Sequence, residues 1–271
     1  MNPLHTAAKT TVAKASVLIA LFLLSSSPAR AALDAPSAAR LSGLNTTPAL
    51  AGELIYRGAT FAQKAAGPEP LFRYERRVAT TPTGIEATHL TRDPAHSLVV
   101  AESAQFNTAY QLQRFTVHNQ QLGYSGVVQV SGDRRRLQYS LNDNGVVSTA
   151  EEAIDLPAVS GPTLFGFILE HRAQLDMGKT VSVRFIVMKE KQTYGLDIRQ
   201  ESAANGQVVY AITPSSWLVR PFLATMRATW DAGSKTWVRY EGRVPPMQTV
   251  AGKLADLDAR VDYSTVSNTY R

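Results

Sequence analysis

The chain has 271 residues, of which 44% are hydrophobic and 18% are charged, and it contains no cysteine. This composition is typical of a globular protein with one large domain or two small ones, and it excludes a disordered chain and a bundle of membrane helices. The lack of cysteine excludes thiol catalysis, disulfide bridges, iron–sulfur clusters and thiolate zinc sites.

The first 31 residues, Met1 to Ala31, are typical of a secretory signal peptide. Lys9 and Lys14 precede the apolar run Val17 to Leu24, and Ala29-Arg30-Ala31 offers the small residues that signal peptidase accepts. The run is shorter than the roughly 20 apolar residues that a membrane helix needs. We therefore expect cleavage near Ala31, no integral membrane segment afterwards, and a mature protein free in the exported space, which in a Gram-negative cell is the periplasm.

Cleavage would also change the charge. The signal carries three basic residues and no acidic one, so its loss lowers the formal net charge from +6 to +3. Nucleic-acid-binding proteins concentrate basic residues in a patch, whereas the longest basic run here is Arg134-Arg135-Arg136, directly after Gly132-Asp133. We interpret this run as a charged hairpin turn rather than an anion site, and we expect no nucleic-acid partner.

Residues 32–50, Ala32 to Leu50, are rich in Ala, Ser, Thr and Pro and predict a flexible leader. Residues 51–247 predict a β domain, because short runs alternate between apolar and polar residues. In the run from Leu71 to Thr80, one parity carries Phe72, Tyr74 and Val78, and the other carries Arg73, Glu75 and Arg77.

Turn residues separate these runs. Asn142 to Gly145, Asn205-Gly206 and Asp231 to Ser234 each lie between two predicted strands, and Asn and Gly tolerate the positive φ of tight hairpins. Consecutive strands joined by hairpins are antiparallel. The pattern predicts a mainly β fold: a single antiparallel β-barrel or strongly curved sheet, with one amphipathic helix and one short helix.

The amphipathic helix is predicted from Pro162 to Met177, with Ser160 as its N-cap and Gly178 after its end. The short helix is predicted at Trp217 to Arg220, capped by Ser215 or Ser216 and limited by Pro221. Residues 248–271, Gln248 to Arg271, read as a C-terminal tail with at most one weak strand.

No motif names a reaction. His89, His96, His118 and His171 lack the close spacing of a metal-binding pair, and there is no G-x-S-x-G, G-x-G-x-x-G or phosphate-loop motif. Glu151 and Glu152 are neighbours on one strand and must point to opposite faces, so they cannot line one cleft as a glycosidase pair would. We expect no enzymatic activity, no catalytic residues, no metal and no cofactor.

The segment from Thr213 to Arg243 is the most distinctive, because it contains all three tryptophans. The candidate ligand-binding residues are Trp217, Arg227, Trp230, Trp237, Arg239 and Tyr240. Their aromatic rings suit the rim of an apolar cavity, with arginine for a carboxylate or phosphate head group. The alternative is a hydrophobic plug that seals the barrel, with Arg239 simply paired to Glu241.

Three short motifs carry a resemblance: P-S-S-W-L-V-R (Pro214 to Arg220), W-V-R-Y-E-G-R (Trp237 to Arg243) and L-F-R-Y-E-R-R (Leu71 to Arg77). They resemble an uncharacterised family of exported bacterial β-rich proteins, which implies no activity. More distantly, the predicted architecture resembles the periplasmic lipoprotein-carrier-like half-barrels, whose curved antiparallel sheet holds acyl chains. A shared fold does not carry function, so no site residue is transferred.

These observations favour a soluble periplasmic binding or carrier protein for an apolar or amphipathic ligand such as a lipid. The alternative is a non-enzymatic envelope structural or interaction protein with a filled barrel. A hydrolase with a scattered site is a third hypothesis. The sequence predicts neither the ligand's identity nor the oligomeric state.

Overall fold

A computed structural model describes residues 52–63, 69–218, 220, 221 and 223–267. The expected signal peptide (1–31) and leader (32–50) lie outside the described residues. The described residues contain the short helices α2 (Gly161–Glu170), α3 (Arg172–Asp176) and η1 (Met188–Glu190). The strands are β1 (Glu53–Ala62), β2 (Phe72–Thr81), β3 (Gly84–Arg92), β4 (Leu98–Phe106), β5 (Leu112–Asn119), β6 (Tyr124–Val130), β7 (Arg136–Asp143), β8 (Val146–Ala153), β9 (Ala158–Val159), β10 (Val181–Val187), β11 (Gln192–Ala204), β12 (Gln207–Pro214), β13 (Met226–Asp231), β14 (Thr236–Val250) and β15 (Lys253–Thr265).

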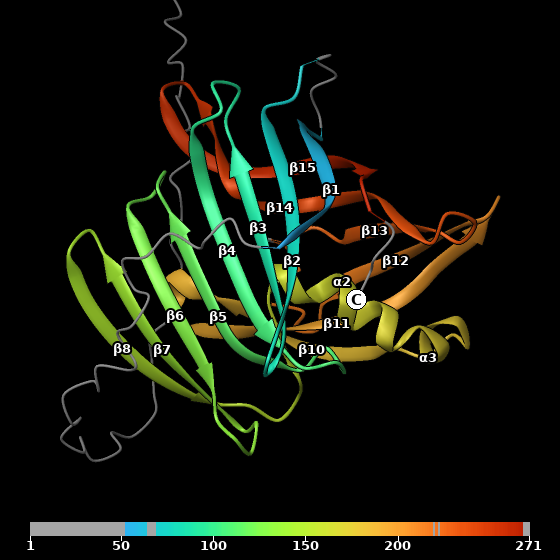
Figure 1. Cartoon of the computed structure of the whole chain (residues 1–271), viewed down its shortest axis with the longest axis horizontal. Helices are drawn as coiled ribbons and strands as arrows, with labels where there is room; N and C mark the ends of the chain where they lie inside the picture. The colour runs from blue at the N-terminus through green and yellow to red at the C-terminus, as the bar shows by residue number, and fades with distance from the viewer. Residues whose placement is uncertain (1–51, 64–68, 219, 222, 268–271) are drawn as a thin grey trace, which may run out of the picture. The chain divides into compact units, whose positions relative to one another are not determined.

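These strands form one 15-stranded sheet in the order β8-β7-β6-β5-β4-β3-β2-β1-β15-β14-β13-β12-β11-β10-β9. Paired strands are antiparallel, except that β9 runs parallel to β10. The sheet curves strongly but does not close, since β8 and β9 are its two edges (Figure 1). The prediction of a mainly β fold with a strongly curved antiparallel sheet is confirmed.

The hairpins follow the predicted turn chemistry. Asn144 and Gly145 between β7 and β8 have φ values of 51° and 91°, and Asn205 and Gly206 between β11 and β12 have 52° and 78°. These left-handed conformations give the twist that a two-residue hairpin needs. Local residue choice therefore accounts for the antiparallel meander.

The amphipathic helix is present but broken. His171, with φ −97° and ψ 9°, ends α2 and begins α3. The short helix predicted at Trp217 is wrong, because the described residues there form bends and turns. Ser215 does not cap a helix: its hydroxyl donates to Asp197 (2.8 Å) and its amide to the Gly195 carbonyl (2.9 Å). The second helix of the fold is α3 instead.

The C-terminal segment also differs from the prediction of a tail. Its 13-residue strand β15 lies in the middle of the sheet, paired with β14 on one side and β1 on the other. The apolar side chains Leu257, Ala259 and Val261 alternate with charged ones and are buried. Strand β15 thus joins the first and last described parts of the chain.

Helix α2 lies inside the curve of the sheet. Its Phe165 ring stacks on Trp237 of β14 (centroids 4.4 Å apart) and meets Tyr263 of β15 edge-on, while α2 also packs against β3 and β4 (Figure 1). The inner face next to α2 and α3 is therefore filled by a core cluster that includes Trp230 and Tyr210.

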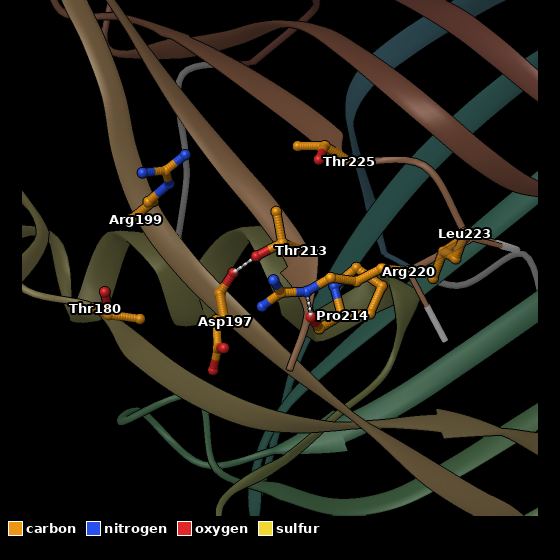
Figure 2. A pocket seen from close by; sticks show the side chains of 8 residues that line it. All are labelled: Thr180, Asp197, Arg199, Thr213, Pro214, Arg220, Leu223 and Thr225. Atoms are coloured by element: carbon orange, nitrogen blue, oxygen red, sulfur yellow. Dashed lines mark hydrogen bonds between the residues drawn. The ribbon is translucent and has the colours of Figure 1, made fainter. Parts of the chain in front are cut away.

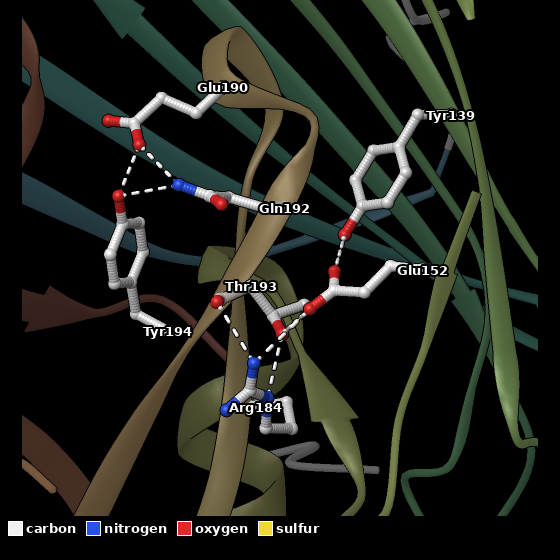
Figure 3. A network of polar contacts seen from close by, with 7 residues as sticks. All are labelled: Tyr139, Glu152, Arg184, Glu190, Gln192, Thr193 and Tyr194. Atoms are coloured by element: carbon white, nitrogen blue, oxygen red, sulfur yellow. Dashed lines mark hydrogen bonds and ion pairs between the residues drawn. The ribbon is translucent and has the colours of Figure 1, made fainter. Parts of the chain in front are cut away.

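A polar network ties strands near the two edges of the sheet together (Figure 3). Glu152 of β8 accepts hydrogen bonds from the hydroxyls of Tyr139 (2.8 Å) and Thr193 of β11 (2.6 Å), and it pairs with Arg184 of β10 (3.2 Å). Strands β8 and β10 are not neighbours in the sheet. Side-chain contacts therefore join them where no backbone hydrogen bonds do. The hairpin tip beside them is fixed by Tyr194, which donates to Glu190.

Candidate functional site

Two of the three tryptophans predicted to surround a ligand are core residues. Trp237 is 1% exposed and Trp230 is 4% exposed. Their rings contact each other edge-on at 5.2 Å, and Trp237 also meets Tyr210 at 6.0 Å. Trp230 and Trp237 therefore pack in the core rather than around an open cavity, although the unclosed sheet has no barrel end for them to seal.

The predicted polar partners of a head group are engaged elsewhere. Arg227 makes two hydrogen bonds to Glu201 (2.6 and 2.9 Å), and Arg239 pairs with Asp262 (2.7 Å). The expected pairing of Arg239 with Glu241 is not formed, because the register of β14 on β15 puts Arg239 opposite Asp262. The hydroxyl of Tyr240 donates to the carbonyl of Arg243 (2.8 Å). The structure does not bring the six predicted residues around one cavity.

Trp217 is the exception, since its side chain is 75% exposed on the connection between β12 and β13. Beside this connection lies a pocket of about 440 Å³, which we call the β11–β12 pocket (Figure 2). It is lined by Thr180, Asp197, Arg199, Thr213, Pro214, Arg220, Leu223 and Thr225.

The chemistry of the β11–β12 pocket is polar, with two guanidinium groups and three threonines. Arg220 donates through Nε to the Pro214 carbonyl (3.0 Å). Asp197 is the acidic residue in the lining, and its carboxylate accepts hydrogen bonds from Ser182 (2.7 Å) and Ser215 (2.8 Å). The arrangement suits a small anionic group more than an apolar one.

A second pocket, which we call the α2 groove, has a volume of about 580 Å³. It lies between the end of α2, the β4–β5 and β6–β7 turns, and the segment after β8. Its apolar lining includes Leu112, Val130, Ile154, Leu156 and Phe167, and its polar lining includes Arg134, Arg135, Asp155, Glu170 and His171.

The arginines of the α2 groove come from the predicted charged turn. Arg136 pairs with Glu151 (3.1 Å), as expected of a solvated turn. The side chains of Arg134 and Arg135, in contrast, make no hydrogen bond or ion pair with the described residues. The turn prediction is confirmed, but its interpretation as solvent-facing alone missed that two of the arginines border a pocket.

Beneath α2 the sheet carries a row of polar residues that the sequence reasoning missed; two of them, Arg76 and His89, are buried, and the third, Glu102, is half-buried. Arg76, His89 and Glu102 are register partners on β2, β3 and β4. Arg76 Nη1 lies 2.7 Å from His89 Nε2 and donates to the Pro162 carbonyl of α2 (2.7 Å). The sequence did hold one indication of this row, because Arg76 lies on the same side of its strand as the apolar residues Tyr74 and Val78.

Burial sets the charge states of this row. It raises the pKa of Glu102 to about 7, and burial followed by the positive charge of Arg76 lowers the pKa of His89 well below its usual value. His89 is therefore neutral near pH 7, and its Nε2 accepts a hydrogen bond from Arg76, because a guanidinium can only donate. Through its Arg76–Pro162 hydrogen bond, the row contacts the start of α2.

Three further findings bear on function. No group of three or more His, Cys, Asp or Glu side chains in the described ranges could hold a metal ion. Among the helices of the described residues, none has the length and apolar character to cross a membrane. Models of protein families, curated proteins and solved structures yield no match to this chain.

Proposed function

We propose that the protein is an exported, non-enzymatic binding protein for an amphipathic molecule with one anionic head group, of the fatty-acid class. The observation that supports the proposal is the α2 groove, where an apolar lining meets two guanidinium groups that make no hydrogen bond or ion pair with the described residues. Its volume of about 580 Å³ lies within the range typical of small-molecule sites, roughly 300–1,000 Å³.

Two physical terms would drive binding in the α2 groove. Burial of an alkyl chain against Leu112, Ile154 and Phe167 gains about 25 cal/mol per Å² of apolar surface. A carboxylate head group would pair with Arg134 or Arg135, whose planar guanidinium groups match its two oxygens. Asp155 and Glu170 in the same lining would repel a second negative charge, so we expect a single anionic head rather than a dianion.

Calorimetric titration tests this proposal with dodecanoate and with dodecanol, each below its aggregation concentration. The parent protein should bind dodecanoate more tightly, and Arg134→Gln/Arg135→Gln should weaken dodecanoate binding by about tenfold, the effect of losing roughly 1.4 kcal/mol. Dodecanol binding should not change. Arg136→Gln is the matched control, because Arg136 pairs with Glu151 and lies outside the groove lining.

Two results would refute the assignment. One is the absence of dodecanoate binding by the parent at millimolar concentration. The other is equal weakening by the control variant Arg136→Gln and the double variant, since this would show a general effect of positive charge rather than a site.

The filled inner face favours a second candidate function, a non-enzymatic envelope structural or interaction protein. Trp230, Trp237 and Phe165 occupy the space that a carrier of the half-barrel kind would leave for its ligand. If no amphipathic ligand binds in the α2 groove, this second function gains support, and a protein partner cross-linked in the exported fraction would establish it.

A further inference from the structure

The most exposed large apolar side chains next to the β11–β12 pocket are Trp217 (75%) and Leu218 (55%). They are adjacent in the connection between β12 and β13, and we call this pair the apolar tip. Single exposed apolar residues are common on protein surfaces, but an exposed Trp-Leu pair on a turn is a larger apolar surface. Trp230 and Trp237, in contrast, are buried in the core. Trp217 is thus the exposed one of the three tryptophans.

The surroundings of the apolar tip are basic. Arg220 follows the tip on the same connection and lines the β11–β12 pocket together with Arg199. The neighbouring connection from α3 to β10 contributes Thr180 to the same pocket, and the exposed Lys179 precedes it in the chain. The side chains of Arg199 and Lys179 make no ion pair with the described residues.

Two acidic groups lie near this pocket, and they differ in how they are paired. Asp197 in the pocket accepts hydrogen bonds from Ser182 and Ser215. Asp176, at the end of α3, pairs with Arg172 (3.1 Å). The two connections themselves carry only the positive charges of Lys179 and Arg220, while Asp197, whose hydrogen-bond donors are neutral hydroxyls, keeps one negative charge in the pocket lining.

We propose that this end of the sheet docks on the surface of a bilayer containing anionic phospholipids. Trp217 and Leu218 would enter the head-group region, where the amphipathic indole ring is most favourable. Arg199, Arg220 and Lys179 would bind lipid phosphates, since basic residues near an anionic membrane surface are attracted to it. The β11–β12 pocket, at about 440 Å³ and with Thr180, Thr213 and Thr225 in its lining, has room for one phosphate head group.

A bilayer fits these features better than a protein partner does. A protein interface is expected to bring complementary side chains to a defined apolar area, whereas two adjacent apolar side chains on a connection that also carries a cation are the pattern of interfacial anchoring. This inference goes beyond the function proposed for the α2 groove, and it involves none of the groove's residues.

The three tryptophans make the test direct, because Trp217 is exposed while Trp230 and Trp237 are buried. Mature protein is mixed with vesicles of phosphatidylcholine alone or of phosphatidylcholine with phosphatidylglycerol. We expect a blue shift of tryptophan emission with the anionic vesicles, quenching by lipids brominated near the head group, and weakening of both by added salt. Trp217→Phe should abolish the blue shift.

Sedimentation with the same vesicles tests the residues. Trp217→Ser/Leu218→Ser should weaken binding to anionic vesicles by about tenfold or more, as expected for the lost apolar burial. Arg199→Gln/Arg220→Gln should reduce it to the level seen with phosphatidylcholine alone. The matched control is Val146→Ser/Val147→Ser, an exposed apolar pair in the β7–β8 hairpin, which should bind as the parent does.

The proposal is overturned if the parent does not bind anionic vesicles, or if the Trp217→Ser/Leu218→Ser variant binds them like the parent. Capture of a single exported protein by the apolar tip, without vesicle binding, would assign the surface to a protein partner instead. Arg134→Gln/Arg135→Gln should still bind vesicles, so failure of the groove and failure of the docking surface are separate results.

Discussion

Arg76, His89 and Glu102 show how single residues decide the electrostatics of the inner face. Each is the register partner of the next across β2, β3 and β4, and Arg76 reaches from this row to α2. A buried charge is tolerated only where it is paired or hydrogen-bonded. Arg76 meets this condition through His89 and Pro162, while Glu102 meets it in part by holding its proton to a higher pH.

The pH dependence of stability should reveal Glu102. Its pKa is raised to about 7 from 4.5, so its contribution to stability is present at low pH and is lost as the pH rises through about 7. His89, with a lowered pKa, has the opposite effect and destabilises the fold as the pH falls below its unfolded value of 6.5. The two effects oppose each other in the parent protein.

Replacing Glu102 by Gln should remove one of these two effects. Relative to the parent, Glu102→Gln should lose about 1–3 kcal/mol of unfolding free energy at pH 5 compared with pH 8, since only the His89 effect remains. Urea unfolding at a series of pH values measures this difference. Glu53→Gln, at an exposed position, is the control and should follow the parent; a variant Glu102→Gln that also follows the parent would contradict the assignment.

At the scale of elements, local sequence signals predicted the hairpins and α2 but not what packs on them. Asn144-Gly145 and Asn205-Gly206 set their turns through their own backbone preferences. Trp237 points to the inner face because α2 packs there. The position of α2 on the sheet cannot be predicted from the residues around Trp237. The β15 strand did carry a signal, since Leu257, Ala259 and Val261 alternate with charged residues, but its small and acidic residues dilute the apolar density.

The contact between α2 and β14 provides the energetic test at this scale. Trp237→Ala removes a ring that stacks on Phe165 and is 1% exposed, so it should cost about 3–5 kcal/mol of unfolding free energy, as large-to-small changes at buried aromatic sites do. Trp217→Ala is the same substitution at an exposed position and should stay within about 0.5 kcal/mol of the parent. Equal costs in chemical denaturation would show that Trp237 rims an open space rather than filling the core.

On the scale of the whole described chain, the sheet depends on the pairing of β1 with β15, the first and last strands in the sequence. Strands β1 and β15 hydrogen-bond side by side, with Thr60 opposite Val261, and Val261 is also opposite Tyr240 of β14. A strand's own alternation does not show which distant strand it pairs with, so the sequence did not predict that residues 253–265 lie between β1 and β14. Without β15, no backbone hydrogen bonds of the sheet would link strands β1 to β8 with strands β9 to β14.

A proline in β15 tests this dependence. At position 261 it removes an amide donor between two paired strands and introduces a ring that a central strand does not accommodate. Val261→Pro should therefore cost about 3 kcal/mol or more and broaden or abolish the cooperative urea transition. Leu254→Pro is the matched control, because Leu254 is exposed and pairs only with Thr249 of β14 near the hairpin turn, so its loss should be clearly smaller. If Val261→Pro unfolds at the same urea concentration as the parent, then β15 is dispensable and side-chain contacts such as the Glu152 network and the Arg76–Pro162 hydrogen bond hold the two groups of strands together.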